Sequence, residues 1–268
     1  MTAASEIVAR TTGLKRRVEQ LGLAANVADL AIDGYTVIRD AAPEPFFEDL
    51  RTAVTTVAQR VRHFRRFPTN LLLEGRVFEQ AVQVEKLNTL YEHLLGPGFI
   101  VSQVSASVKR PTPKAFAIHA DMNGYDQPFP GHAAIATAIF CCDEFTEAGG
   151  CTRFVAGSHH LRRHPVGDEG EAEAHPAEAP AGSIILWDGA VWHGNCPRTL
   201  PGERVVLHLT CNRHNVRPIE SYADIDPSVL ERNPPEFARL LGIGDRWGRK
   251  QMMPDARPPR SVRPAVAR

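Results

Sequence analysis

The sequence carries no excess of charge of either sign. Its 268 residues include 31 Lys and Arg and 31 Asp and Glu, so the formal net charge is zero when histidine is neutral. A protein that binds nucleic acid or an anionic membrane over a large surface needs a strong positive excess, which this chain lacks. We therefore expect no nucleic acid and no membrane among its partners, and the sequence indicates no oligomeric state.

Long apolar runs and paired cysteine motifs are missing as well. No stretch reaches the roughly eighteen apolar residues of a transmembrane helix, and the N-terminal MTAASEIVARTTGLKRR lacks the unbroken apolar core of a signal peptide. The cysteines contain no C-x-x-C motif and are odd in number, which favours small buried thiols over a disulfide framework. They are Cys141, Cys142, Cys151, Cys196 and Cys211. These features predict a cytoplasmic protein.

The composition is that of an ordinary globular protein, with 43% hydrophobic and 23% charged residues. The first third of the chain is mostly helical in its spacing. Apolar residues recur every three or four positions over 14–25, 46–64 and 84–94, and prolines precede the second of these segments. Between the first two, the stretch GYTVIRD (34–40) predicts a strand.

From residue 99 the period of the apolar pattern changes to two. In FIVSQVSASVK (99–109) the polar Gln103, Ser105, Ser107 and Lys109 fall on one face. Further short strands are predicted, bounded by Gly, Pro and Asp. They are AAIATAIFC (133–141), GSIILWD (182–188) and RVVLHLTC (204–211). Several such strands with irregular connections predict a sandwich or jelly roll covered by the N-terminal helices.

We expect a single domain over residues 1–253, followed by a Pro/Arg-rich tail at 254–268. Within it we expect a helical part over about 1–98, a jelly-roll core over about 99–215 and a C-terminal extension over 216–253. Residues 161–180, rich in Pro, Gly and acidic side chains, predict a long mobile loop that could act as a lid.

The stretch AIHADMNGYD (117–126) places His119 and Asp121 two positions apart. On a strand such residues share a face, where an imidazole and a carboxylate can hold one metal ion, although a turn hydrogen bond would explain this pair alone. His193, after a strand and an Asp188-Gly189 turn, could face the same cavity. Two histidines and one carboxylate form the facial triad of non-heme iron oxygenases, which leaves coordination positions open.

Arg204 strengthens this interpretation. It lies eleven residues after His193, at the start of RVVLHLT, and an antiparallel return would bring its guanidinium back beside the metal. The planar guanidinium suits a carboxylate, such as the distal one of a 2-oxo acid that chelates iron at its other end. Arg204, Val206, His208 and Thr210 would share one face of this strand. An exposed arginine at a strand end remains the alternative.

With these residues in place, the sequence resembles the phytanoyl-CoA dioxygenase family of Fe(II)/2-oxoglutarate-dependent oxygenases. The resemblance rests on DGYTVIRDAAPEPFFEDLR, HAD, EAGGCTRFVAGSH, GSIILWDGAVWHGN and the following Arg204. It implies a mainly β fold with flanking helices, namely a double-stranded β-helix (jelly roll, cupin-like) core with the N-terminal helices packed outside it.

The resemblance also implies roles for individual residues. His119, Asp121 and His193 would bind iron, and Arg204 would bind the C5 carboxylate of 2-oxoglutarate. The further residues expected at the co-substrate are Ser107, Gln103, Thr152 and Asn195, with Thr137 a weaker candidate. Asn195 stands where many relatives carry Ser or Thr. Asp121 stands where halogenating relatives carry Ala or Gly, so hydroxylation is favoured over halogenation.

The implied activity is O2-dependent hydroxylation, or another oxidation, of an unactivated C–H bond in a small molecule, with 2-oxoglutarate converted to succinate and CO2. Residues expected to line the substrate site are Met122, Asn123, Tyr125 and Trp192. The basic stretch RVRHFRRF (60–67) could meet a phosphate-bearing group such as coenzyme A, although a solvated helix face explains it better. The alternatives are a zinc-dependent hydrolase with the same ligands and a non-catalytic small-molecule-binding protein on a degenerate oxygenase fold.

Overall fold

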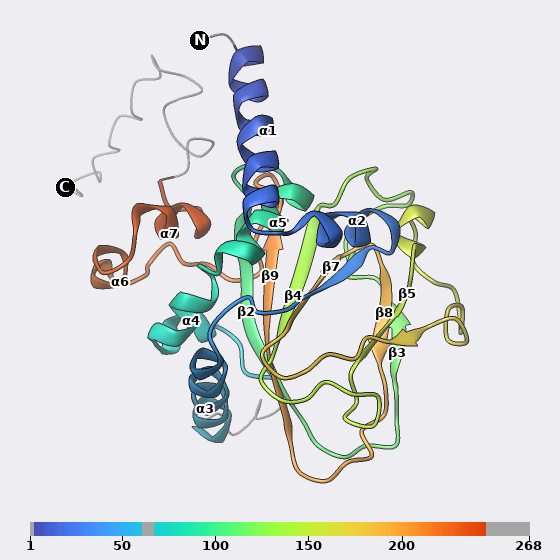
Figure 1. Cartoon of the computed structure of the whole chain (residues 1–268). Coiled ribbons are helices and arrows are strands. Elements are labelled where there is room, and N and C mark those ends of the chain that lie inside the picture. Colours follow the sequence, from blue (N-terminus) through green and yellow to red (C-terminus); the bar gives the residue numbers. More distant parts are fainter. Residues whose placement is uncertain (1–2, 61–66, 245–268) are drawn as a thin grey trace, which may run out of the picture.

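The strands of the computed structural model, which describes residues 3–60 and 67–244, form two antiparallel sheets (Figure 1). The five-stranded sheet has the order β1-β7-β4-β9-β2, with β1 Tyr35–Ile38, β7 Ile184–Asp188, β4 Ile135–Cys141, β9 Arg204–Asn212 and β2 Ile100–Lys109. The four-stranded sheet has the order β3-β8-β5-β6, with β3 Phe116–His119, β8 Trp192–Asn195, β5 Thr152–Val155 and β6 His175–Pro176. The mainly β jelly-roll expectation is confirmed.

The helices lie outside the five-stranded sheet, where α3 and α5 pack against its strands (Figure 1). Their bounds are α1 Ala3–Gln20, α2 Ala24–Ile32, α3 Glu44–Arg60, α4 Arg76–Ala81, α5 Glu85–Leu95, α6 Pro227–Glu231 and α7 Pro235–Leu240. Two 3-10 turns, η1 Leu71–Glu74 and η2 Ser158–Leu161, complete the described elements. None of the helices in the described part of the chain has the length and hydropathy of a transmembrane segment.

Three expectations about elements need correction or completion. The helix predicted over 14–25 is two helices, because Gly22 takes a left-handed backbone (φ 68°) that ends the first. The helix predicted over 46–64 is confirmed as far as Arg60, and its remainder lies outside the described residues. Residues 161–180, predicted as a loop, include β6, which pairs with β5.

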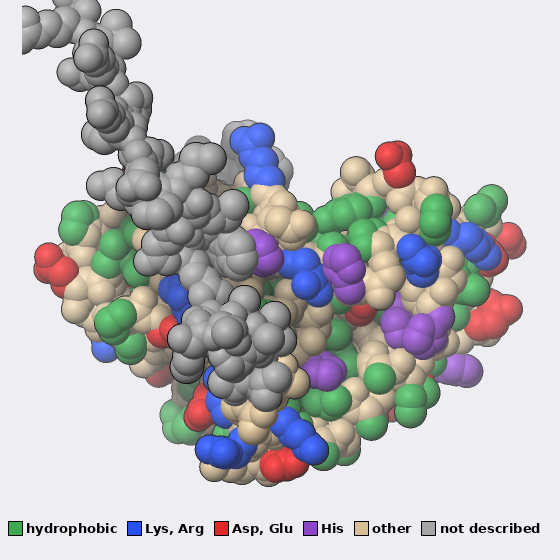
Figure 2. Space-filling model, turned by 90° about the horizontal axis from the view of Figure 1, so that it is seen from above, with side chains coloured by type: hydrophobic (Ala, Val, Ile, Leu, Met, Phe, Trp, Pro, Cys, Tyr) green, Lys and Arg blue, Asp and Glu red, His purple; other side chains and the backbone are tan. Residues whose placement is uncertain are grey.

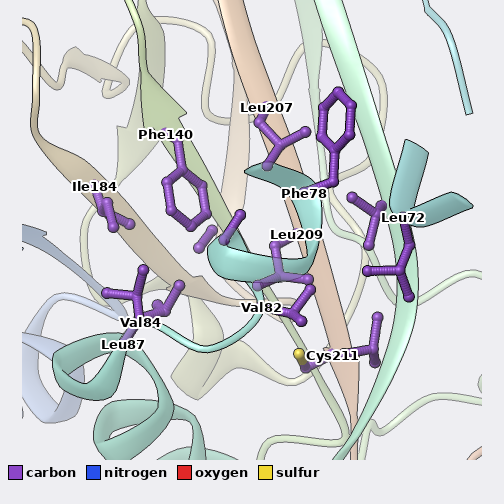
Figure 3. Close-up of a cluster of buried hydrophobic side chains, with 14 of the residues drawn as sticks. Leu72, Phe78, Val82, Val84, Leu87, Phe140, Ile184, Leu207, Leu209 and Cys211 are labelled. Carbon is purple, nitrogen blue, oxygen red and sulfur yellow. The ribbon is translucent and has the colours of Figure 1, made fainter. Parts of the chain in front are cut away.

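The five-stranded sheet separates two hydrophobic clusters, because alternate side chains of a strand point to opposite faces. On β9, Leu207 and Leu209 face the helices and join residues such as Phe78 and Leu87 (Figure 3). Val206 faces the other way, into a smaller cluster that also contains Phe154 of the four-stranded sheet. The inner faces of the two sheets therefore pack on each other, and the polar residues of β9 that share the Val206 face point into the molecule.

Candidate metal centre

His119 and His193 are neighbours across the strand pair β3–β8. The two residues stand opposite each other in the register, and their ring centroids are 4.3 Å apart. Gly194, next to His193, permits this pairing, because a Cβ there would overlap the carbonyl oxygen of Phe116. The strand pair thus fixes the spacing of two imidazoles that the sequence places 74 positions apart.

Asp121 completes the cluster from a bend just beyond the end of β3 rather than from the strand itself. Its backbone N–H donates to the carbonyl of Gly189 (2.7 Å), in the turn between β7 and β8. Its carboxylate oxygens lie 3.6 Å from Nε2 of His119 and 3.5 Å from Nε2 of His193. One potential ligand atom from each of the three residues falls within 4.8 Å of the others, as a shared metal ion requires.

The histidine rings are oriented with Nε2 toward the carboxylate. Nδ1 of His119 lies 3.0 Å from the carbonyl oxygen of Ala117, and Nδ1 of His193 lies 3.0 Å from that of Val191. A proton on each Nδ1 satisfies these carbonyls and leaves the Nε2 lone pair free. Backbone carbonyls commonly fix the tautomer of metal-binding histidines in this way.

The Asp121 carboxylate is ionised and held by further donors. The indole N–H of Trp187 donates to Oδ2 (3.2 Å), and the Thr137 hydroxyl donates to the same oxygen at 3.4 Å. Burial opposes ionisation, but the two histidines and the Trp187 N–H outweigh it and lower the pKa of Asp121 to about 2. Burial lowers the pKa of His193, which favours the neutral ring that a metal ion needs, whereas the pKa of His119 is raised because Asp121 outweighs burial there.

A cavity of about 390 Å³ lies beside these ligands. Its polar lining includes Ser107, Thr152, Asn195, Arg204 and His208, and its apolar lining includes Ile139, Phe145, Val206, Phe67 and Phe116. The Phe116 ring also packs edge-on against His119, with centroids 5.1 Å apart, so the wall of the cavity adjoins the metal ligands. Among the described residues that line it, none is acidic.

Arg204 lies at the buried end of this cavity, with an exposed fraction of 3%. One guanidinium nitrogen donates to the carbonyl of Gly150 (2.8 Å), and the group stacks over Phe145. Its Nε is buried with no hydrogen-bond partner among the described residues. Burial lowers the pKa of Arg204 to about 10, so the side chain stays cationic at neutral pH. A buried cation with an unpaired donor needs an anionic partner.

Lys109 is a second cation at this end, opposite Arg204 in the β2–β9 register. Its ammonium donates to the carbonyl of Cys196 (2.7 Å), and burial and the nearby Arg204 lower its pKa to about 8. The sequence predicted that Lys109 shares a face of β2 with Ser107, which lines the cavity, but it gave no reason to assign Lys109 to the site.

Arg204 does reach the site, but by a different path from the expected one. Strand β9 does not pair with β8; the chain crosses to the other sheet, where β9 lies between β4 and β2. Ser107, Thr152 and Asn195, which were expected at the co-substrate, line the cavity, and the Thr152 hydroxyl donates to the Asn195 side chain (3.1 Å).

Other expected site residues lie elsewhere. Gln103 is opposite Thr210 in the sheet and is not among the residues lining the cavity. Met122 and Trp192 are buried in a hydrophobic cluster with Phe129, so the structure places them in the core rather than at a substrate surface. The indole N–H of Trp192 is already bonded to the carbonyl of Arg163 (2.8 Å), so it is not available to a substrate.

Asn123 is exposed beyond the metal ligands, and Tyr125 packs partly buried against the cluster of Met122 and Trp192. No residue of the segment 161–180, expected as a possible lid, lines the cavity; its Glu171 pairs with Arg153 of β5 instead. Of the basic stretch 60–67, only the ends are described, and Phe67 lines the cavity.

Histidine by itself does not mark this site, because several histidine side chains reach the surface (Figure 2). The sequence did not predict two contacts with Asp121, although Thr137 was a weaker candidate for the co-substrate site. Trp187 and Thr137 lie on strands far from Asp121 in the chain, and only the sheet brings them to it. The alternation of the strands predicts that both side chains point inward, but it does not predict that they bond Asp121.

The arrangement can be compared with known proteins. Dioxygenase af480 of Aspergillus fumigatus is 28% identical over 158 residues, which cover 58% of this chain and 51% of that protein. Dioxygenase FUM3 of Gibberella moniliformis is 27% identical over 163 residues, covering 59% of this chain and 54% of the relative. The chain thus matches about half the length of each of these relatives.

Among solved structures, HygX from Streptomyces hygroscopicus with nickel and 2-oxoglutarate bound aligns with a TM-score of 0.62 over 73% of this chain and 88% of HygX. At 12% identity this likeness concerns the fold. A sequence profile of the phytanoyl-CoA dioxygenase family matches residues 30–204, which include all three clustered ligands and end at Arg204. The chain therefore belongs to the phytanoyl-CoA dioxygenase family.

Proposed function

We propose that this protein is an Fe(II)- and 2-oxoglutarate-dependent dioxygenase that hydroxylates, or otherwise oxidises, an unactivated C–H bond of a small-molecule substrate. The observation that carries the proposal is the pairing of a His119–Asp121–His193 cluster with a buried, incompletely bonded Arg204 in the adjoining cavity. The small-molecule substrate, O2 as a partner and a cytoplasmic location belong to the same proposal.

The ligand cluster fits Fe(II). Two imidazole Nε2 atoms and one carboxylate oxygen are the donor set of the facial iron triad, which leaves positions free for a co-substrate and for dioxygen. The backbone carbonyls behind the rings and the Trp187 N–H behind the carboxylate are the outer contacts that such a centre needs.

The cavity fits 2-oxoglutarate. The unpaired Nε of Arg204 and the ammonium of Lys109 place positive charge at its buried end, where the distal carboxylate would bind. Ser107, Thr152 and Asn195 supply hydroxyl and amide groups along the wall. A zinc hydrolase with the same three ligands would give the buried Arg204 no partner.

The mechanism assigns separate tasks to the residues of this chain. When bound, Fe(II) with 2-oxoglutarate and dioxygen supplies the oxidant for the substrate C–H bond, and succinate and CO2 are released. His119, Asp121 and His193 hold the metal on one side, and Arg204 orients the co-substrate by its distal carboxylate. Ile139, Phe145 and Val206 line the same cavity with apolar surface and limit the access of water to it.

The mouth of the cavity supports a substrate with an apolar part. Phe67 and Phe116 line it and are 61% and 58% exposed, an unusual position for two large apolar side chains so close to a polar centre. The substrate carbon would approach the metal past Phe116, whose ring contacts His119.

The test is conversion of 2-oxoglutarate to succinate by the Fe(II)-loaded protein, measured with and without candidate small molecules that carry an apolar part. We expect turnover that depends on iron and is stimulated by substrate. Asp121→Ala should abolish hydroxylation, because the centre loses its carboxylate ligand. Activity that persists with zinc in place of iron would support the hydrolase alternative. Absence of both turnover and co-substrate binding would refute the proposal.

A further inference from the structure

His208 is a half-buried polar side chain of the cavity that the proposed function leaves without a task. It lies on the inward face of β9 and lines the cavity together with Arg204 and Val206. No hydrogen bond joins its ring to another of the described residues. The ring is therefore free to bond a ligand in the cavity, and a polar group that becomes buried when a ligand binds needs such a partner.

The position of His208 along β9 relates it to both ends of the site. Residues that share a strand face follow one another at about 7 Å, and here the order is Arg204, Val206, His208 and Thr210. Arg204 lies at the end of the cavity where the distal carboxylate of 2-oxoglutarate would bind. The Thr210 hydroxyl lies 3.2 Å from that of Thr137, which donates to Asp121. His208 therefore stands between the carboxylate-binding end and the metal ligands.

Two simpler roles do not fit this histidine. It is not a member of the ligand cluster, in which the potential donor atoms of His119, Asp121 and His193 lie within 4.8 Å of one another. A packing role would favour an apolar side chain like its neighbours Val206 and Ile139, the latter opposite His208 in the sheet. Burial and the nearby Arg204 lower the pKa of His208 to about 4, so the ring is neutral and offers one N–H donor and one acceptor.

We propose that His208 donates a hydrogen bond to the metal-chelating end of the co-substrate, at the oxygens of its 2-oxo acid group. Arg204 would then fix one end of 2-oxoglutarate and His208 the other. The bond would orient the 2-oxo acid group toward His119, Asp121 and His193. This inference rests on the proposed function, since it requires a 2-oxo acid bound at the metal.

The experiment compares two 2-oxo acids under anaerobic conditions with the Fe(II)-loaded protein. Binding of 2-oxoglutarate and of 2-oxopentanoate, which lacks the distal carboxylate, is followed by the visible charge-transfer absorption of the chelate. We expect His208→Phe to weaken binding of both acids about tenfold, as for the loss of a hydrogen bond to a charged group. Arg204→Met should weaken binding of 2-oxoglutarate alone.

Three controls separate this contact from a structural role. His208→Gln keeps an N–H donor, so it should restore binding close to that of the wild type. Fe(II) affinity without co-substrate should be unchanged in both His208 variants. His175→Phe makes the same substitution at an exposed histidine on β6 and should leave binding unchanged. If His208→Phe fails to fold, His208→Ala provides the same comparison.

The outcomes are distinct. Unchanged affinity of His208→Phe for both acids, in a protein whose wild type binds them, would overturn this inference and leave the proposed function standing. Weaker binding of 2-oxoglutarate alone would place His208 at the distal carboxylate and also overturn it. A wild type that forms no chelate with 2-oxoglutarate and Fe(II) would overturn both proposals.

Discussion

Asp121 is held in place by strand β4 and by the end of β7 with the turn that follows it. Gly189 accepts its backbone N–H, Trp187 donates to its carboxylate, and Thr137 donates to the same oxygen. The carboxylate is thereby oriented before any metal arrives. In metal centres, loss of such an outer contact typically lowers metal affinity about 10- to 100-fold.

Trp187→Phe should therefore weaken Fe(II) binding about tenfold, because it removes the N–H donor while keeping most of the ring. The measurement is a metal titration, with Co(II) as a spectroscopic substitute for Fe(II). Trp192→Phe is the matched control: that indole is equally buried, but its N–H donates to the carbonyl of Arg163. Equal metal affinities of the two variants would contradict a role for Trp187 in orienting Asp121.

At the scale of residues, the sequence predicted ligands better than their supports. His119 and Asp121 are recognisable because they lie two positions apart in the chain, and the buried positions of Arg204 and Ser107 follow from the strand period. Trp187 could be placed on an inward face by the same period, but its partner lies 66 positions away. Nothing local distinguishes an indole that bonds a ligand from one that fills a core, as Trp192 does.

Among the elements, the turn between β7 and β8 links the two sheets to the metal centre. It contains Gly189, whose carbonyl accepts from Asp121, and Asp188, which accepts from the backbone N–H of Ala190 (2.9 Å). Burial raises the pKa of Asp188 to about 6, although this hydrogen bond and the nearby His160 act in the opposite direction. The turn thus contains a carboxylate whose ionisation disfavours the folded state.

The sign of the pH dependence follows. The folded protein binds a proton at Asp188 more tightly than the unfolded chain, so this group's contribution to stability decreases as pH rises from about 4 toward about 6 and beyond. Asp188→Asn removes the titration and keeps an acceptor for Ala190. We expect its stability relative to the wild type to rise by about 2 kcal/mol between pH ~4.5 and pH ~7.5, measured by urea denaturation.

Asp168→Asn is the control, because it removes an exposed carboxyl from the segment 161–180. It measures how the loss of one negative charge at the surface changes the stability. A stability difference between Asp188→Asn and the wild type that stays constant with pH would show that Asp188 does not titrate in this range.

The strand pair β3–β8 sets the spacing of the histidines, and Gly194 permits their close approach. A Cβ at Gly194 would overlap the Phe116 carbonyl oxygen and crowd Ala117. Gly194→Ala should push the strands apart, cost about 1–3 kcal/mol in stability and weaken metal binding about tenfold. Both effects can be measured on one sample by calorimetry and metal titration.

Gly13→Ala is the comparison, because a Cβ at Gly13 meets no atom within 4 Å. Its metal affinity should equal that of the wild type. A Gly194→Ala protein with unchanged metal affinity would show that the pairing of His119 and His193 tolerates a wider strand separation.

The strands of the five-stranded sheet could be predicted from the sequence, while their pairing could not. The period of two predicted β2, β4, β7 and β9, and the structure confirms each of them. The return from His193 to Arg204 was expected as an antiparallel pair, yet the chain changes sheets there. Sequence distance limits how far apart two strands can lie, but burial on both faces decides which strand pairs with which.

On the scale of the whole molecule, the segment after β9 returns to cover the start of the core. Its Glu220 has an exposed fraction of 6% and accepts hydrogen bonds from the backbone N–H groups of Asn70 (2.7 Å) and Val104 (2.9 Å). The hydroxyl of Tyr222 donates to the same carboxylate. One side chain thus joins the C-terminal segment, the loop before η1 and strand β2, a convergence that no local pattern predicts.

Glu220→Gln should destabilise the protein by about 2 kcal/mol, because an amide offers one acceptor oxygen where the carboxylate offers two, and its NH2 group would face backbone donors. The change should appear as a lower urea midpoint with an unchanged slope. Glu231→Gln, at an exposed position of α6, should leave the midpoint in place.

Since Val104 lies on the same strand as Ser107, Glu220→Gln should also loosen the wall of the cavity that Ser107 lines. The affinity of this variant for 2-oxoglutarate should therefore fall together with its stability. A midpoint equal to that of the wild type would mean that the C-terminal segment is held by its apolar contacts, such as those of Tyr222 and Phe237 with the main core.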